Sequence, residues 1–323
     1  MTLKFVLKYL KDCHRKLKDL SQKGEGNICY LWYDFIICSI THGAIINHYT
    51  RGQLYKFKGC ERRMSMTYKR ILKSFSKMNE ADSIKILNNK HLFNAHFAPF
   101  VKRKWLYSKD MTIEAFSELC RSCSTLMIKP EDGLEGNGIS KITPPHSQGS
   151  IYQLFKQAKN HSVMIEECIV QHHDMIYGNT SVNTIRAHSV IDHEGKVHLS
   201  KMLFRVGVGD SVVDNYAHGG CVYEVQLETG RIISPSLKKD GTEVFIHPQT
   251  DIFMLGRRIP NWDKVCEGVK QAHAMLPGCR FIGWDVAITE DGIELIEGNH
   301  NPDYELLEFF GSRGWWHKIK QYL

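Results

Sequence analysis

The chain has 323 residues, enough for two domains or for one larger enzyme with several lobes. Hydrophobic residues make up 42% and charged residues 24%, proportions of a globular protein that exclude a disordered chain. The net charge of +7 is uneven, because residues 1–75 hold 15 Lys and Arg against 5 Asp and Glu.

The first quarter of the chain is expected to be mainly helical. Leucines and a valine recur at helical spacing among lysines over residues 1–20, which predicts an amphipathic helix. Three more helices are predicted, over residues 29–46, 62–78 and 83–96. Asp82 or Ser83 is expected to be the N-cap of the last one. We therefore expect a basic helical lobe over residues 1–80.

The basic lobe suggests an anionic partner. Nucleic acid, an anionic membrane surface or a phosphorylated substrate would all be attracted to it, whereas a solvated helical face needs no partner. No zinc-finger or RRM motif accompanies the charge, so no nucleic-acid partner is expected. Peripheral contact with an anionic membrane stays as a hypothesis.

Targeting and cysteine usage indicate a cytoplasmic protein. Lysines interrupt the apolar residues at the start of the chain and no cleavage site follows. The most apolar stretch, residues 31–46, contains Asp34 and His42 and is short for a membrane span. Cys120 and Cys123 form a single close pair among ten scattered cysteines, which favours free thiols on a helix over a zinc site.

Beyond residue 120 the pattern becomes α+β. Apolar and β-branched runs predict strands over residues 125–129, 139–143, 163–170, 184–191, 197–206, 222–227 and 231–233. Helices are expected over residues 150–159 and 261–276, before a last pair of strands.

A glycine-rich turn follows the first of these strands. Lys129 ends the strand, and Gly133, Gly136 and Gly138 follow it. Glycines let the backbone approach an anion, and the lysine adds a positive charge. A P-loop and a dinucleotide-binding fingerprint are excluded, because no Gly-Lys-Ser/Thr triplet and no helix follows the glycines. We interpret the turn as a flap in a β-hairpin that closes over a nucleotide, with an ordinary long turn as the alternative.

The last strand pair is acidic. A three-residue loop at residues 290–292 would pair Thr289 with Ile293, Ala287 with Leu295 and Asp285 with Glu297. Asn299 would then lie on the same face as Glu297, because side chains alternate along a strand. Facing carboxylates destabilise a sheet unless a cation joins them, and these oxygen ligands suit Mg²⁺. A two-residue Asp-Gly turn would instead place Asp285 opposite Gly298, and a solvent-facing acidic hairpin is the plainer alternative.

Taken in order, these motifs resemble the ATP-grasp superfamily, and within it the sugar-transfer-associated group found with bacterial surface-polysaccharide genes. The resembling segments run from about residue 30 to 305 and include residues 88–90, 103–105, 129–138, 164–169, 181–186, 204–207, 213–220, 247–248, 259–262 and 283–299. The resemblance implies an ATP-grasp fold of two α+β subdomains gripping ATP. These would span residues 81–168, with the flap, and 169–323, with the magnesium site.

The resemblance also implies roles for individual residues. On the nucleotide it implies Lys90, Lys129, Gly133, Gly136 and Gly138 at the phosphates and Glu166, Glu167 and Ile169 at the adenine. Arg186 would hold the γ-phosphate or an acyl phosphate, and Asp285, Glu297 and Asn299 would bind one or two Mg²⁺. The acceptor side would be lined by Arg205, Asp214, Asn215, Gly219 and Gly220. The acidic ribose ligand of the family is not evident, and either His172 or Asp174 is expected to serve.

The implied activity is an ATP- and Mg²⁺-dependent ligase. It would convert a carboxylate, expected to be sugar-linked, into an acyl phosphate that an amine such as an amino acid captures. Three other functions remain open: a phosphotransferase on the same fold, a non-catalytic ATP-binding partner of a glycan assembly complex, and a nucleic-acid-binding protein suggested only by the basic lobe.

Overall fold

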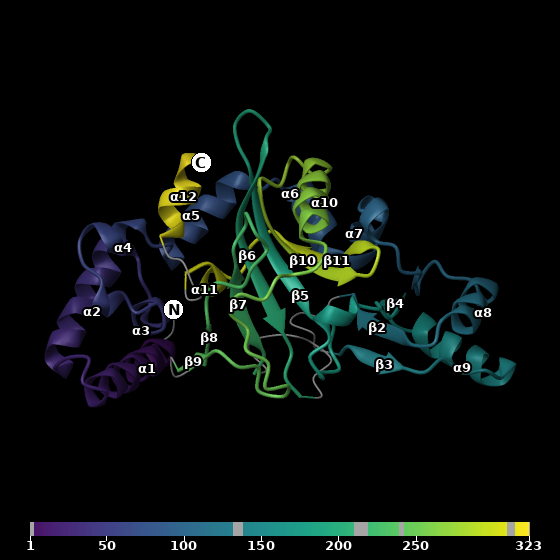
Figure 1. The fold of residues 1–323 in the computed structure, drawn as a ribbon, viewed down its shortest axis with the longest axis horizontal. Helices are drawn as coiled ribbons and strands as arrows, with labels where there is room; N and C mark the ends of the chain where they lie inside the picture. The colour runs from purple at the N-terminus through teal and green to yellow at the C-terminus, as the bar shows by residue number, and fades with distance from the viewer. Residues whose placement is uncertain (1–2, 132–137, 210–218, 239–241, 309–313, 323) are drawn as a thin grey trace. The chain divides into compact units, whose positions relative to one another are not determined.

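The computed structural model describes residues 3–131, 138–209, 219–238, 242–308 and 314–322. The chain forms two compact units (Figure 1). The first contains residues 1–78, 237–243 and 303–323, and the second contains residues 79–236 and 244–302.

The first unit is helical. Its elements are α1 (Leu3–Gln22), α2 (Ile28–His42), α3 (Ile46–Thr50), η1 (Leu54–Lys56), α4 (Cys60–Met64), α5 (Tyr68–Met78), α11 (Tyr304–Glu308), α12 (Trp315–Ile319) and η5 (Lys320–Tyr322). The helix predicted over residues 62–78 is divided, because α4 ends at an extended Ser65. The long apolar α2 begins at the Asn27 cap and ends at Gly43, whose left-handed φ of 69° favours glycine.

The second unit begins with short helices. The helix predicted over residues 83–96 is two, α6 (Ala81–Asn88) and α7 (Lys90–His96), because the Asn89 side chain caps α7. The N-cap of α6 is Glu80, so the expected cap at Asp82 or Ser83 is wrong. The turn η2 (Ala98–Phe100) then leads into the first sheet.

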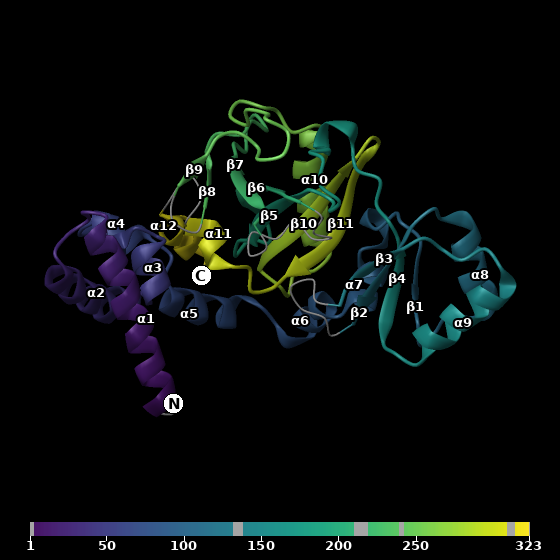
Figure 2. The ribbon, with the colours of Figure 1, turned by 90° about the horizontal axis from the view of Figure 1, so that it is seen from below.

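A four-stranded antiparallel sheet follows, with the order β1-β4-β2-β3. Its strands are β1 (Trp105–Tyr107), β2 (Leu126–Pro130), β3 (Ser140–Ile142) and β4 (Val163–Glu167). The helices α8 (Ile113–Ser122) and α9 (Gln148–Lys159) lie together beside it (Figure 2), and they share one apolar core with Leu126 and Ile165. The expected hairpin around the glycine-rich turn is confirmed by the pairing of β2 with β3.

A five-stranded antiparallel sheet has the order β11-β10-β5-β6-β7. Its strands are β5 (Thr184–Ile191), β6 (Val197–Val206), β7 (Cys221–Val225), β10 (Phe281–Thr289) and β11 (Gly292–Asn299), and the turn η3 (His173–Met175) precedes them. The helix α10 (Trp262–Ala274) covers one face and encloses the largest apolar core. The strand predicted over residues 231–233 is absent from the described structure, where Arg231 and Ile232 form only isolated bridges. A short strand β8 (Ser236–Leu237) pairs with β9 (Glu243–Val244).

Within the described ranges, no helix combines the length and the apolar character that crossing a bilayer requires.

Candidate active site

The two faces of the five-stranded sheet differ in chemistry. Trp284, Val286 and Phe204 face α10 in the apolar core. Neighbouring residues on the same strands point the other way, because side chains alternate. That opposite face carries the buried charged residues Asp285, Arg186, Arg205, Lys201 and Glu224. Burying charged side chains is costly unless they form ion pairs or bind a ligand, so this polar face is the candidate site.

Asp285 lies at the centre of the polar face and is 5% exposed. Arg186 is its direct neighbour on β5 and binds it through two nitrogens, with 2.9 Å between Nη2 and Oδ2. Arg205 on β6 reaches the same oxygen through Nη1 at 3.0 Å. Burial alone would raise the pKa of Asp285, but the two guanidinium groups outweigh it and lower the pKa to about 2. The site therefore holds an ionised carboxylate with two arginines fixed beside it.

Asp285 also faces Glu297, as expected, but by a different route. The loop has two residues, since Thr289 pairs with Gly292, so the expected pairing of Thr289 with Ile293 is wrong. A bulge between Asp285 and Val286 then restores the register that brings the two carboxylates together.

Glu297 and Asn299 complete this edge of the site. The amide of Asn299 donates to Glu297 Oε1 at 3.3 Å. The side chain of Glu297 is exposed to solvent at the surface of the site, but the protein around it is dense. Loss of hydration there raises the pKa of Glu297, and the negative charge of Asp285 raises it further. Within the described ranges Glu297 has no ion pair with a cationic side chain, whereas Asp285 keeps an acceptor position on Oδ1 beyond its arginine contacts. Two such carboxylates and an amide oxygen fit a divalent cation.

The four-stranded sheet supplies a second polar cluster. Lys129 on β2 and Glu166 on β4 lie on the face away from α8 and α9 and form an ion pair in which Glu166 is buried and Lys129 is partly buried. Arg103 and Asn94 also bind Glu166, at 3.1 and 2.7 Å. Burial would raise the pKa of Glu166, but Arg103 and Lys129 hold it well below its usual range. By alternation Glu167 lies on the other face, where its carboxylate accepts from the backbone N–H of Lys104.

The base of the predicted flap is anchored to α7. Lys90 donates to the backbone carbonyl of Glu131 at 3.1 Å, and the Glu131 carboxylate accepts from Tyr107 and Asn89 at 2.6 and 2.8 Å. Gly138 has a φ of 77°, and a Cβ there would come within 2.9 Å of the Pro130 ring. Lys90 thus contacts the chain at Glu131, and Lys129 lies two residues before that point. Both lysines are therefore close to the start of the predicted flap.

Four predicted residues lie outside the described part of the chain: Gly133 and Gly136 of the flap, and Asp214 and Asn215 of the acceptor side. Gly219 and Gly220 are described and lead directly into β7, Gly219 exposed with a φ of 95° and Gly220 buried.

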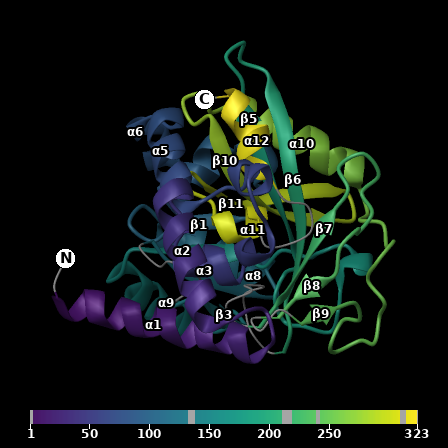
Figure 3. The ribbon, with the colours of Figure 1, turned by 90° about the vertical axis from the view of Figure 1, so that its left-hand side faces the viewer.

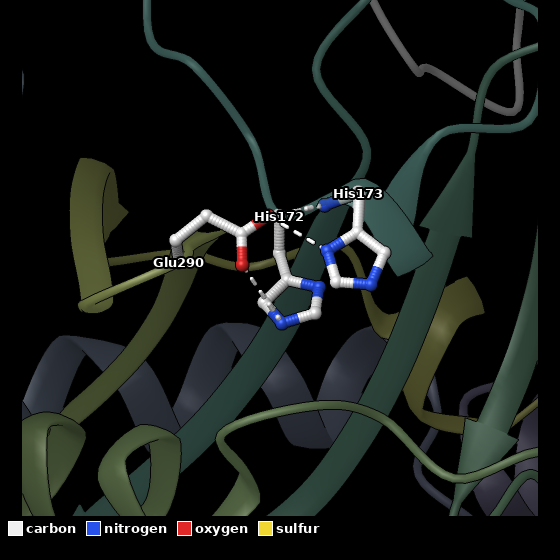
Figure 4. A group of neighbouring side chains, drawn as sticks. All are labelled: His172, His173 and Glu290. Atoms are coloured by element: carbon white, nitrogen blue, oxygen red, sulfur yellow. Dashed lines mark hydrogen bonds and ion pairs between the residues drawn. The ribbon is translucent and has the colours of Figure 1, made fainter.

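The segment after β4 folds against the β10–β11 turn. Ile169 is half-buried, and the backbone N–H of His172 donates to Ile288 at 2.7 Å. Both imidazoles of His172 and His173 turn toward Glu290 (Figure 4), with 3.4 Å from His172 Nε2 and 2.8 Å from His173 Nδ1 to its oxygens. One nitrogen of each histidine and one oxygen of Glu290 lie within 4.8 Å of one another, a spacing that a metal ion could bridge. However, each oxygen of Glu290 already contacts an imidazole nitrogen. These contacts tie the segment after β4 to the β10–β11 turn.

The two ribose candidates differ in availability. His172 is largely covered, its Nδ1 accepts from the backbone N–H of Asp174 at 3.1 Å, and its Nε2 faces Glu290. The carboxylate of Asp174 is more than half exposed.

Several buried polar residues of the site were not singled out from the sequence. Lys201, 1% exposed, lies on the same sheet face as Arg186 and directly opposite His188. Arg103 joins the two sheets, because it binds Glu166 and also donates to the carbonyl of Leu295 at 2.8 Å. The sequence did contain one signal for Lys201. It lies four positions before Arg205 in one predicted strand, and alternation places both side chains on the same face.

The family is established by comparison with protein-family models. The model described as sugar-transfer associated ATP-grasp matches residues 69–322. The chain therefore belongs to the sugar-transfer associated ATP-grasp family, and the expected fold class, an ATP-grasp fold preceded by a helical region, is confirmed. A search of curated protein sequences gives no match.

Solved structures with low sequence identity are also similar. The ATP-grasp ligase PsnB, complexed with a phosphomimetic variant of minimal precursor, Mg and ADP, has a TM-score of 0.45 and 14% identity over 78% of this chain and 66% of that one. The ADP complex of purK, N5-carboxyaminoimidazole ribonucleotide synthetase, has a TM-score of 0.43 and 12% identity, over 68% of this chain and 46% of that one. D-alanyl-alanine synthetase A from Vibrio cholerae O1 biovar eltor str. N16961 has a TM-score of 0.43 and 15% identity, over 74% of this chain and 65% of that one. This chain thus spans between 46% and 66% of the length of these proteins.

Proposed function

We propose that the protein is an ATP-dependent ligase that joins a carboxylate to an amine through an acyl phosphate. The observation that carries this proposal is the buried Asp285 with two arginines, beside the accessible carboxylate of Glu297. Family membership supports ATP as the phosphoryl donor. The expected substrates are a sugar-linked carboxylate and an amino acid or similar amine.

In this proposal Asp285, Glu297 and Asn299 hold Mg²⁺, which neutralises negative charge on the phosphate oxygens when bound. Lys90 and Lys129 are proposed to bind the phosphates of ATP, together with the backbone of the flap glycines. The exposed carboxylate of Asp174 suits the ribose better than the engaged His172 does. The backbone around Glu167 and Ile169 would meet the adenine.

The arginines are proposed to stabilise the transferring phosphoryl group. A substrate carboxylate oxygen attacks the γ-phosphorus, the bond to ADP breaks, and an acyl phosphate forms. The amine then attacks the acyl carbon, loses a proton and releases phosphate. Asp285 fixes the guanidinium groups of Arg186 and Arg205 before substrate arrives, so little reorganisation is needed as charge develops. Gly219, Gly220, Asp214 and Asn215 are proposed to line the acceptor side.

The proposal is tested by ADP release from ATP and Mg²⁺ with uronic acids and amino acids, alone and paired. We expect release only with a carboxylate–amine pair, and loss of at least about 100-fold in Glu297→Gln, the usual cost of losing a transition-state contact. Glu267→Gln, an exposed glutamate on α10, is the matched control.

The other outcomes identify the competing functions. ADP release that needs no amine and yields a stable phosphate ester would indicate a phosphotransferase. Nucleotide binding in calorimetry without turnover on any pair would favour a non-catalytic ATP-binding partner. Absence of ATP binding would overturn the proposal altogether.

A further inference from the structure

The N-terminal helix α1 has two halves with different surroundings. In the C-terminal half, Cys13, Leu17 and Leu20 are buried in the core of the helical unit. In the N-terminal half, Leu3 is 76% exposed and Leu7 is 51% exposed. Within its own unit, this half extends past the neighbouring helices (Figures 2 and 3). Leu3 and Leu7 of the projecting half therefore stay largely uncovered by the described residues of that unit.

Apolar and basic side chains form parallel stripes on this half. Leu3, Leu7 and Leu10 are exposed at positions i, i+4 and i+7, which places them on one side of the helix. Lysines at residues 4, 8 and 11 follow with the same spacing, one residue further around, and all three are exposed. No acidic residue lies among them. A leucine stripe flanked by a lysine stripe is the pattern of a helix that lies at an anionic membrane surface.

A second exposed apolar stripe runs along α2. Tyr30, Tyr33, Ile36, Ile37 and Ile40 recur at helical spacing and are 40% to 72% exposed. The charged residue of this helix, Asp34, points inward and is paired with Arg62. Soluble surfaces rarely show a contiguous apolar stripe of several turns, so this face is also suited to a partner.

The charge of the helical unit selects the chemistry of that partner. Residues 1–78, 237–243 and 303–323 contain 21 Lys and Arg against 10 Asp and Glu, a net charge of +11. The rest of the chain contains 21 against 25, a net charge of −4. Negatively charged lipid headgroups complement the first unit, and the acyl region accepts leucine and isoleucine side chains.

We propose that the helical unit docks peripherally on an anionic phospholipid bilayer, with the leucine stripe of α1 inserted at the headgroup boundary and its lysines on the headgroups. The exposed stripe of α2 is a second apolar face of the same unit. The proposal does not depend on the ligase activity, since none of these residues belongs to the candidate active site.

Flotation of the full-length protein with vesicles tests the proposal. We expect the protein to float with vesicles of mixed phosphatidylcholine and phosphatidylglycerol, to stay behind with phosphatidylcholine alone, and to be released by high salt. The double variant Lys4→Gln, Lys8→Gln should bind about 30-fold more weakly, from the roughly fivefold that each basic residue contributes near an anionic surface. The matched control Lys196→Gln, Lys270→Gln changes the net charge equally on exposed positions of the second unit.

A second pair of variants tests the apolar contact. Leu3→Ser with Leu7→Ser should weaken binding by at least about tenfold, because two side chains no longer enter the apolar boundary. Ile233→Ser with Ile246→Ser, both 50% exposed in the second unit, is the control. Circular dichroism checks that each variant is folded.

Three outcomes would overturn the proposal. One is absence of binding to either vesicle. Another is equal weakening by the control pair and the α1 pair. The third is a concentration-dependent dimer, seen in sedimentation velocity, together with absence of vesicle binding. If Leu3→Ser with Leu7→Ser abolished that dimer, a second copy of the chain would be the partner of this face.

Discussion

Asp285 is the residue on which the charges of the candidate site converge. Its partners are distant in the sequence, since Arg186 on β5 lies 99 residues away and Arg205 on β6 lies 80 residues away. Because Arg186 and Arg205 share this one anion, the group behaves as a buried ionic triad. Such groups are costly to break, since removal of one partner leaves the others buried and unpaired.

The first prediction concerns stability. Asp285→Asn should lower the free energy of unfolding by about 3–5 kcal/mol, because two buried guanidinium groups lose their counter-charge. Urea unfolding followed by circular dichroism measures it. Asp291→Asn, at the exposed turn of the same hairpin, is the control and should stay within about 0.5 kcal/mol of the parent protein. Equal effects of the two substitutions would contradict the triad.

The second prediction concerns pH. The pKa of Asp285 is about 2 in the folded protein against an ordinary value of 3.8, so its contribution is fully present above about pH 4. The contribution is lost as the pH falls through the folded pKa. The difference in unfolding free energy between the parent protein and Asp285→Asn should therefore shrink between pH 4 and pH 2. A difference that stays constant over this range would show that Asp285 is not responsible.

At the scale of elements, the β10–β11 hairpin shows how a bulge places chemistry. A two-residue loop alone would put Asp285 opposite Ile296, and the bulge moves the partner on by one residue to Glu297. On the other face of β10, Trp284 donates to Ser189 at 2.8 Å, and Ser189 contacts His273 of α10 at 2.7 Å. The same strand thus holds the site on one face and the helix on the other.

The third prediction addresses that second contact. Ser189→Ala should lower the free energy of unfolding by about 1–3 kcal/mol, because buried polar groups of Trp284 and His273 lose their partner. A double-mutant cycle with Trp284→Phe measures the coupling between the two side chains. A coupling free energy near zero would argue against the hydrogen bond as the source of the effect.

At the scale of the whole molecule, the helical unit is assembled from distant stretches of the chain. Glu308, near the C-terminus, is buried and accepts hydrogen bonds from the backbone N–H groups of Met66 and Trp315, at 2.6 and 2.8 Å. Arg70 lies over the ring of Trp316 at 5.5 Å. The N-terminal helices therefore depend on residues after 302 for part of their polar and aromatic contacts.

The fourth prediction follows from this dependence. Glu308→Ala should speed amide hydrogen exchange in residues 60–78 and 314–322, because two buried N–H groups lose their acceptor. The strands of the five-stranded sheet should exchange as before. The matched control is Glu61→Ala, since Glu61 is exposed and lies in the same unit. Faster exchange throughout the sheet would indicate that the two units unfold together.

The bounds of β5 and β6 agree with the predicted ranges. Turn-forming residues mark their ends in the sequence, since Asp192 and Gly195 lie between the two strands and Gly207 follows β6. Helix ends were less accurate: Asn89 divides a predicted helix by capping α7, and Ser65 divides another. These breaks depend on a local cap or bend that a smooth apolar periodicity does not report.

Local order and spacing along the chain were enough to predict the fold class, the hairpin around the glycine-rich turn and the resemblance that the family match confirms. They also predicted Asp285 opposite Glu297, although through the wrong loop. The contacts of Arg186 and Arg205 with Asp285, of Lys129 with Glu166, and of Arg103 with both sheets became evident only in the folded chain. Those contacts join strands far apart in the chain, and a bulge of one residue changes which of them face one another.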